Sequence, residues 1–224
     1  MPNIYGSMEL VVAEGVKDLP LEGNGWGVFQ GCGKMTEATL PSTLESIGVF
    51  AFFQCGQLRE VDLSKTKVTT IGEEAFYGCG KMTEATLPST LESIGRGAFI
   101  GCGQLREVDL SKTKVTTIGE GAFYNCPLLQ SVTLSPHTTE LGRGAFKGCE
   151  VLSSLPLSPN VTKFGGNVFY NCTKLHELAG SSSGDVFEKC TKLHELAGSS
   201  SQDAVIAYLR TQVSRRATKP FCIY

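Results

Sequence analysis

The sequence predicts a mainly β, right-handed solenoid: an open stack of short coils, each of which contributes a short strand. Three observations predict it. Cysteine and phenylalanine recur at a fixed period, each period carries a short strand pattern, and a glycine marks the same turn in successive copies. A period of about 20 to 50 residues is typical of solenoids, in which each unit buries its apolar sides against its neighbours. We therefore expect about eight coils, none of which could fold alone.

Residues 1–24 are expected to form an irregular N-terminal cap. Apolar residues recur between Met8 and Leu21, but the full repeat is absent there. An open stack leaves the apolar face and the strand edge of its first coil uncovered, so a solenoid needs such a cap.

Residues 25–200 carry the repeat, which is clearest in its cysteines. Seven of them lie 23 or 24 residues apart, and a phenylalanine stands three residues before each one. They are Cys32, Cys55, Cys79, Cys102, Cys126, Cys149 and Cys172. Like residues of successive coils should stack in continuous rows, so that Phe76, Phe99 and Phe123 touch in the interior.

Each repeat contains two apolar groups. The segment Leu58–Leu63 has apolar first, fourth and sixth residues, and this alternation predicts a short strand with one buried side. A second apolar pair, such as Val68 and Ile71, precedes the glycine turn. Residues 31–48 are identical to residues 78–95, and residues 56–72 to residues 103–119, so two coils were copied as one pair.

Residues 201–224 are expected to form a C-terminal capping helix and tail. A serine at position 200 or 201 can cap the helix, and its apolar residues share one face. These apolar residues are Val205, Ile206, Leu209 and Val213.

The pattern Leu-x-x-Val-x-Leu-Pro…Leu-x-x-Ile-Gly-x-x-Ala-Phe-x-x-Cys resembles the BspA-like (Treponema-type) leucine-rich repeat, from about Gly25 to Leu196. The resemblance implies an arc or horseshoe with parallel strands on its concave side. It also implies recognition rather than catalysis, often by surface-exposed adhesins. The first six residues lack the basic start and apolar stretch of a secretory signal, which favours the cytoplasm, with the cell surface as the alternative.

Composition and charge exclude several function classes. A net charge of −2 gives no general attraction for nucleic acid or for anionic membranes. The three histidines have no nucleophile or base beside them, so we expect no enzyme and no cofactor. The cysteines should form a column of buried free thiols, because parallel side chains on stacked coils hold the Cβ atoms slightly too far apart for disulfides.

One arrangement resembles a zinc site. Cys172 and His176 recur as Cys190 and His194, which are ligands of suitable chemistry. The cysteines belong to the inward column, however, and His176 lies on another side of the coil. We therefore expect no metal and attribute the spacing to duplication.

The outward residues of the strands are the leading candidates for partner binding. They are largely acidic, with arginines beside them. The predicted site consists of Glu37, Arg59, Glu60, Asp62, Glu84, Arg106, Glu107 and Asp109. Such a face would select a basic peptide or protein surface. The alternative is a solvated face whose charges only prevent adhesion.

A second candidate surface lies near the N-terminal end. Phe50 and Phe53 replace Gly97 and Ile100 of the sister coil. The predicted patch consists of Trp26, Val49, Phe50 and Phe53. It is either covered by the N-terminal cap or is a surface for self-association, as in a homodimer, or for another partner.

The sequence as a whole favours a non-enzymatic scaffold for protein–protein recognition, with a protein partner, no nucleic acid and no membrane. The alternative is a cell-surface adhesin that binds a host protein or glycan. The near-identical copies fit a recently duplicated array or an engineered one equally well.

Overall fold

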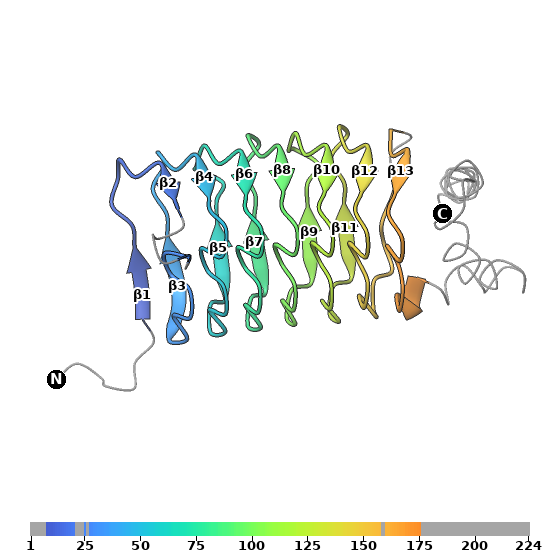
Figure 1. The fold of residues 1–224 in the computed structure, drawn as a ribbon, viewed down its shortest axis with the longest axis horizontal. Helices are drawn as coiled ribbons and strands as arrows, with labels where there is room; N and C mark the ends of the chain where they lie inside the picture. Colours follow the sequence, from blue (N-terminus) through green and yellow to red (C-terminus); the bar gives the residue numbers. More distant parts are fainter. Residues whose placement is uncertain (1–7, 21–24, 26, 158–159, 176–224) are drawn as a thin grey trace, which may run out of the picture.

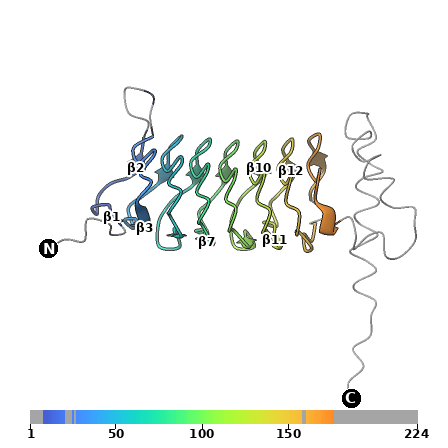
Figure 2. The same cartoon turned by 90° about the horizontal axis from the view of Figure 1, so that it is seen from below.

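The computed structural model describes residues 8–20, 25, 27–157 and 160–175. These residues form an elongated, open row of similar coils, with β1 and β2 at one end and β13 at the other (Figure 1). Strands from successive coils pair in parallel, and Figure 2 shows the same row from a second side. The predicted mainly β solenoid is therefore confirmed.

The first set of strands follows the cysteines along the chain. Its members are β1 (Met8–Val11), β3 (Met35–Thr39), β5 (Glu60–Asp62), β7 (Glu84–Thr86), β9 (Glu107–Asp109) and β11 (Ser131–Thr133). They form one sheet in the order β1-β3-β5-β7 and a second sheet of β9 and β11, so strand pairing is interrupted between β7 and β9. We call the outward side of these six strands the strand face.

The second set precedes the glycine turns and forms one continuous sheet. Its members are β2 (Asp18–Leu19), β4 (Ser46–Ile47), β6 (Thr70–Ile71), β8 (Ser93–Ile94), β10 (Thr117–Ile118), β12 (Glu140–Leu141) and β13 (Lys163–Phe164). All seven pair in chain order. This sheet holds the coils together where the first set is interrupted.

The N-terminal segment is more regular than the sequence suggests. In residues 8–20, β1 pairs with β3 and β2 pairs with β4, so the segment extends both sets of strands as an incomplete coil. The sequence pattern does not reveal this coil, because residues 8–20 lack the Phe-x-x-Cys turn. The segment thereby covers the strand edges of the first full repeat.

A column of phenylalanine rings forms the centre of the core. The rings of Phe76, Phe99 and Phe123 lie parallel, with centroids 5.2 and 5.3 Å apart, and each is almost fully buried. Burial of one such ring stabilises the fold by about 1.5–3 kcal/mol, and offset stacking adds to this. The predicted contact between like residues of successive coils is confirmed.

The turn glycines are required by close approach of the backbones. A Cβ atom at Gly95 would lie 2.7 Å from the carbonyl carbon of Gly72 in the previous coil, and one at Gly72 would lie 2.6 Å from that of Gly48. Such contacts are shorter than van der Waals packing permits. Glycine recurs here because it lets the coils stack at strand-like separation.

The C-terminal predictions lie outside the described residues. They are the last of the coils expected in residues 25–200 and the capping helix within residues 201–224. Within the described part, the coil after β11 is less regular, because only an isolated bridge from Ser131 to Ser154 continues the first set of strands. The same part of the chain contains no helix long and apolar enough to cross a membrane.

Candidate partner-binding face

Strand register brings the predicted glutamates into one row. Glu37 lies opposite Glu60, and Glu60 lies opposite Glu84, because β3, β5 and β7 pair in parallel. All three side chains are exposed, and neighbouring strands lie about 4.8 Å apart. Like charges placed opposite one another destabilise strand pairing. Glu107 lies across the interruption and faces Ser131 instead.

The two predicted aspartates have a structural task at the ends of their strands. Asp62 Oδ1 accepts a hydrogen bond from the backbone N–H of Ser64 at 2.8 Å, and Asp109 Oδ1 accepts one from Ser111 at the same distance. These serine hydrogen bonds lower the pKa of both carboxyl groups from its ordinary value. Both residues therefore stay ionised at neutral pH while they close the turns.

The two predicted arginines lie beside glutamates of the strand face without neutralising them in the described part of the chain. Within the described residues, neither Arg59 nor Arg106 forms an ion pair, although each directly precedes a glutamate. Both side chains are exposed. The structure therefore leaves the acidic row without direct cationic partners from these positions.

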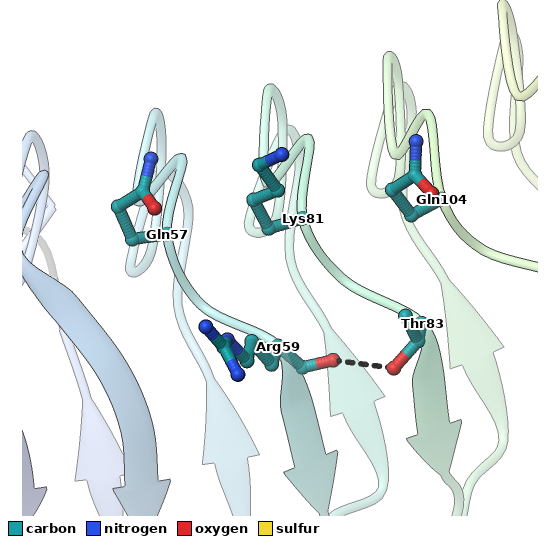
Figure 3. Close-up of a pocket in the computed structure, with 5 residues that line it drawn as sticks. All are labelled: Gln57, Arg59, Lys81, Thr83 and Gln104. Atoms are coloured by element: carbon teal, nitrogen blue, oxygen red, sulfur yellow. Dashed lines mark hydrogen bonds between the residues drawn. The ribbon is translucent and has the colours of Figure 1, made fainter.

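Arg59 instead borders a hollow that sequence reasoning missed. The hollow has a volume of about 320 Å³ and is lined by Gln57, Arg59, Lys81, Thr83 and Gln104. Gln57, Lys81 and Gln104 stand at the same place in three successive coils and point the same way (Figure 3). The signal was present in the sequence, because glutamine and lysine alternate two residues after the cysteines.

Thr83 connects the first two of the three coils that form this hollow. Its backbone N–H donates to the carbonyl oxygen of Arg59 at 2.8 Å, and its hydroxyl donates to the same oxygen at 3.2 Å (Figure 3). Thr83 thereby fixes the backbone of Arg59 beside Lys81. Arg59 and Lys81 are both exposed to solvent.

The predicted apolar patch is only partly described. Trp26 lies outside the described residues, whereas Val49, Phe50 and Phe53 are half-buried. The Phe53 ring stacks on Tyr77 at 4.7 Å and meets the Phe50 ring edge-on at 5.5 Å. Phe50 has a φ of 57°, a conformation that is strained for an aromatic residue. The homodimer that this patch would support stays a prediction.

The cysteine column is structural. Six described cysteines from Cys55 to Cys172 are buried, and none of the described cysteines forms a disulfide. Each buried thiol donates to the carbonyl oxygen of a phenylalanine in the previous coil, as Cys126 does to Phe99 at 3.2 Å. Burial raises the pKa of Cys55 and of Cys126 to about 12, so these thiols are poor nucleophiles at neutral pH.

The zinc-like arrangement falls largely beyond the described coils. Cys172 is buried and its thiol donates to the carbonyl oxygen of Phe146 at 3.0 Å. His176, Cys190 and His194 lie outside the described residues. Cys172 thus has the same structural role as the cysteines before it.

Comparison with known proteins agrees with this architecture. The model of the BspA type leucine-rich repeat region matches six copies over residues 25–128 and 108–205. No curated protein matches the chain. The solved leucine-rich repeat protein TpLRR of T. pallidum is similar, with 27% identity, a TM-score of 0.68, and coverage of 84% of this chain and 83% of that one.

Two further solved structures share the fold. One is a leucine-rich cell surface protein from Faecalibacterium prausnitzii, with 24% identity, a TM-score of 0.59 and 75% of this chain covered. The other is a leucine-rich repeat protein from Bacteroides ovatus, with 24% identity, a TM-score of 0.53 and 73% covered. This chain spans 46% and 49% of their respective lengths.

Proposed function

Because this chain belongs to the BspA-type leucine-rich repeat family, we propose that it is a non-enzymatic recognition scaffold whose strand face binds a basic peptide or protein surface. One observation carries the proposal. Glu37, Glu60 and Glu84 form an exposed row in strand register, and within the described residues Arg59, which directly precedes Glu60, forms no ion pair with them.

The glutamate row is unfavourable in the free protein. Three like charges on adjacent strands repel one another, and a cationic ligand would replace that repulsion with attraction. Aligned charges also steer an oppositely charged partner during association, an effect that salt weakens. A basic segment laid across β3, β5 and β7 would contact all three glutamates.

A titration with a fluorescent lysine octapeptide tests this function. We expect binding at 50 mM salt that weakens at 500 mM, and about tenfold weaker binding for the double variant Glu60→Gln/Glu84→Gln. The estimate follows from exposed ion pairs, which contribute at most about 1 kcal/mol each. The matched control Glu92→Gln/Glu120→Gln removes the same charge from exposed positions outside the row and should bind like the unaltered protein.

Two outcomes would contradict the proposal. Salt-insensitive binding would show that the charged row does not drive the interaction. Equal weakening in the control variant would show that the peptide responds only to overall charge, which is the behaviour of a merely solvated face.

A cell-surface adhesin that binds a host protein or glycan is the second candidate. It is favoured by the cell-surface description of the similar Faecalibacterium protein. Labelling of intact producing cells with a membrane-impermeant biotin reagent separates the two. Labelled protein supports the adhesin, and protein protected until the cells are lysed supports an interior scaffold.

A further inference from the structure

The hollow beside the glutamate row has the opposite chemical character from that row. Arg59 and Lys81 contribute positive charge, and Gln57, Thr83 and Gln104 contribute amide and hydroxyl groups. Within the described part of the chain, neither of the two cations is neutralised by an ion pair. Arginine and lysine donate but do not accept hydrogen bonds, so the hollow is suited to an oxygen-rich anionic group.

The internal duplication provides a comparison within the same chain. The equivalent positions in the next copied pair of coils carry apolar residues in place of the lysine and of one glutamine. These positions are Gln104, Arg106, Leu128, Gln130 and Val151. At the equivalent positions of the preceding pair of coils, Leu10 and Val12 stand in place of Gln57 and Arg59. The complete donor set therefore occurs once among these three equivalent places.

The hollow also lies where the pairing of the first set of strands is interrupted. Arg59 and Thr83 directly precede β5 and β7, whereas Gln104 belongs to the coil that leads into β9. Strand pairing is interrupted between β7 and β9, so the hollow spans that interruption. The two cations thus lie one coil apart at the entrance to the glutamate row.

A free anion would gain little from this site. Exposed ion pairs strengthen binding by at most about fivefold each, and Glu60 and Glu84 directly follow Arg59 and Thr83 in the chain and would repel the anion. A ligand that carries both charges avoids this loss, because its cations meet the glutamates while its anion meets the arginine and lysine. The arrangement therefore favours a segment of mixed charge.

We propose that the hollow binds the carboxylate of an acidic residue within the segment that occupies the strand face. The partner is then a basic segment that carries one acidic side chain. Arg59 can hold a carboxylate through two parallel hydrogen bonds, with Lys81 and the two glutamine amides as further donors. This inference extends the proposed binding of a basic segment and rests on it.

The test uses lysine-rich nonapeptides in which one glutamate, or one glutamine as its neutral match, is moved through the positions between the lysines. We expect the glutamate peptide to bind about fivefold more tightly than its glutamine match at one position. The double variant Arg59→Gln/Lys81→Gln should lose that gain and still bind the glutamine peptides. The control Lys67→Gln/Lys114→Gln, which removes the same charge from exposed positions outside the hollow, should keep the gain.

The outcomes separate this inference from the proposed function. If glutamine peptides bind and every glutamate peptide binds more weakly than its match, the hollow does not accept a carboxylate, while binding of a basic segment stands. A gain that survives Arg59→Gln/Lys81→Gln places the carboxylate elsewhere and overturns the inference. If no peptide binds at low salt, both proposals are wrong.

Discussion

Each cysteine of the column has two roles at the level of single residues. It is a small side chain buried in the core, and its thiol gives the phenylalanine carbonyl oxygen of the previous coil a second hydrogen bond. The carbonyl oxygen of Phe99, for example, accepts from the backbone N–H of Cys102 at 3.3 Å and from the Cys126 thiol at 3.2 Å. A residue that was only small and apolar, such as alanine, would leave this buried acceptor with a single partner.

The buried thiols predict a loss of stability in mild alkali. Cys126 has a pKa of about 12 in the folded chain, whereas an unfolded cysteine has a pKa of about 8.5. Above pH 8.5 the unfolded state releases its thiol proton and the folded state does not, so the free energy of unfolding falls as pH rises. The expected slope is about 1.4 kcal/mol per pH unit for each such thiol, measured by urea unfolding between pH 7.5 and 9.5.

A serine variant isolates the contribution of one thiol to this slope. Cys126→Ser retains a donor for Phe99 but does not titrate, so its slope should be shallower by about 1.4 kcal/mol per pH unit above pH 9. Val108→Ala is the control, because it removes buried apolar volume and no titratable group. Parallel slopes for Cys126→Ser and the unaltered protein would contradict the assignment.

At the scale of the element, the glycine turn sets how closely the coils stack. The turn glycines lie against the backbone of the previous coil, and their N–H groups continue the ladder of hydrogen bonds between coils, whereas their carbonyl oxygens accept within the same turn, as that of Gly95 does from the N–H of Ala98 at 3.4 Å. Gly95, for example, donates to the carbonyl oxygen of Ile71 at 2.8 Å. The continuous second sheet depends on this close approach.

Two alanine substitutions test this role of the turn. Gly95→Ala places a Cβ atom 2.7 Å from the carbonyl carbon of Gly72, and we expect it to lower the free energy of unfolding by 2 kcal/mol or more, as an order-of-magnitude estimate for overpacking. Gly80→Ala is the matched control, because its nearest contact is 4.0 Å away. Thermal unfolding of both should show a large loss for the first and a change within about 0.5 kcal/mol for the second. Similar stability of the two variants would show that the stack adjusts freely at this turn.

At the scale of the whole molecule, the chain behaves as a row of units that contact only their neighbours. Removing residues 56–102 deletes one copied pair and joins Cys55 to Gly103, which is followed by the same residues that follow Cys55 in the full chain. Phe53, which stacks on Tyr77, would then meet Tyr124 at the equivalent place. The new coil contacts should resemble those that were removed.

We expect this shortened chain to fold with a proportionately smaller denaturant dependence. The deletion removes 47 of 224 residues, so the urea m-value should fall by about a fifth. Circular dichroism should keep its β signature, and the hollow should be lost with Arg59 and Lys81. A chain that fails to fold would show that the stack depends on contacts beyond neighbouring coils.

The sequence by itself determined the repeat, the strands and the buried columns. The repeat places three phenylalanines in the interior, because a position that carries the same apolar residue in successive coils is one that every coil buries. These are Phe76, Phe99 and Phe123. The sequence predicts the conformation of the turn in part, because Asn125 and Gly148 have positive φ angles and belong to residue types that tolerate this left-handed conformation. Phe50 lies at the position that Gly97, Gly121 and Gly144 occupy in other coils, so the repeat marks it as left-handed although phenylalanine itself does not favour that conformation.

Only the tertiary structure decided how the surface residues are grouped. Residues 31–48 and 78–95 are identical, yet β3 pairs with β5 whereas β7 does not pair with β9. The hollow lies at this interruption, and Arg59 borders it instead of pairing with a glutamate. Burial is fixed within each coil by its own apolar pattern. Surface contacts depend instead on the offset between neighbouring coils, that is, on how far one coil is shifted relative to the next. That offset is set along the whole stack, so a repeating sequence does not encode it locally.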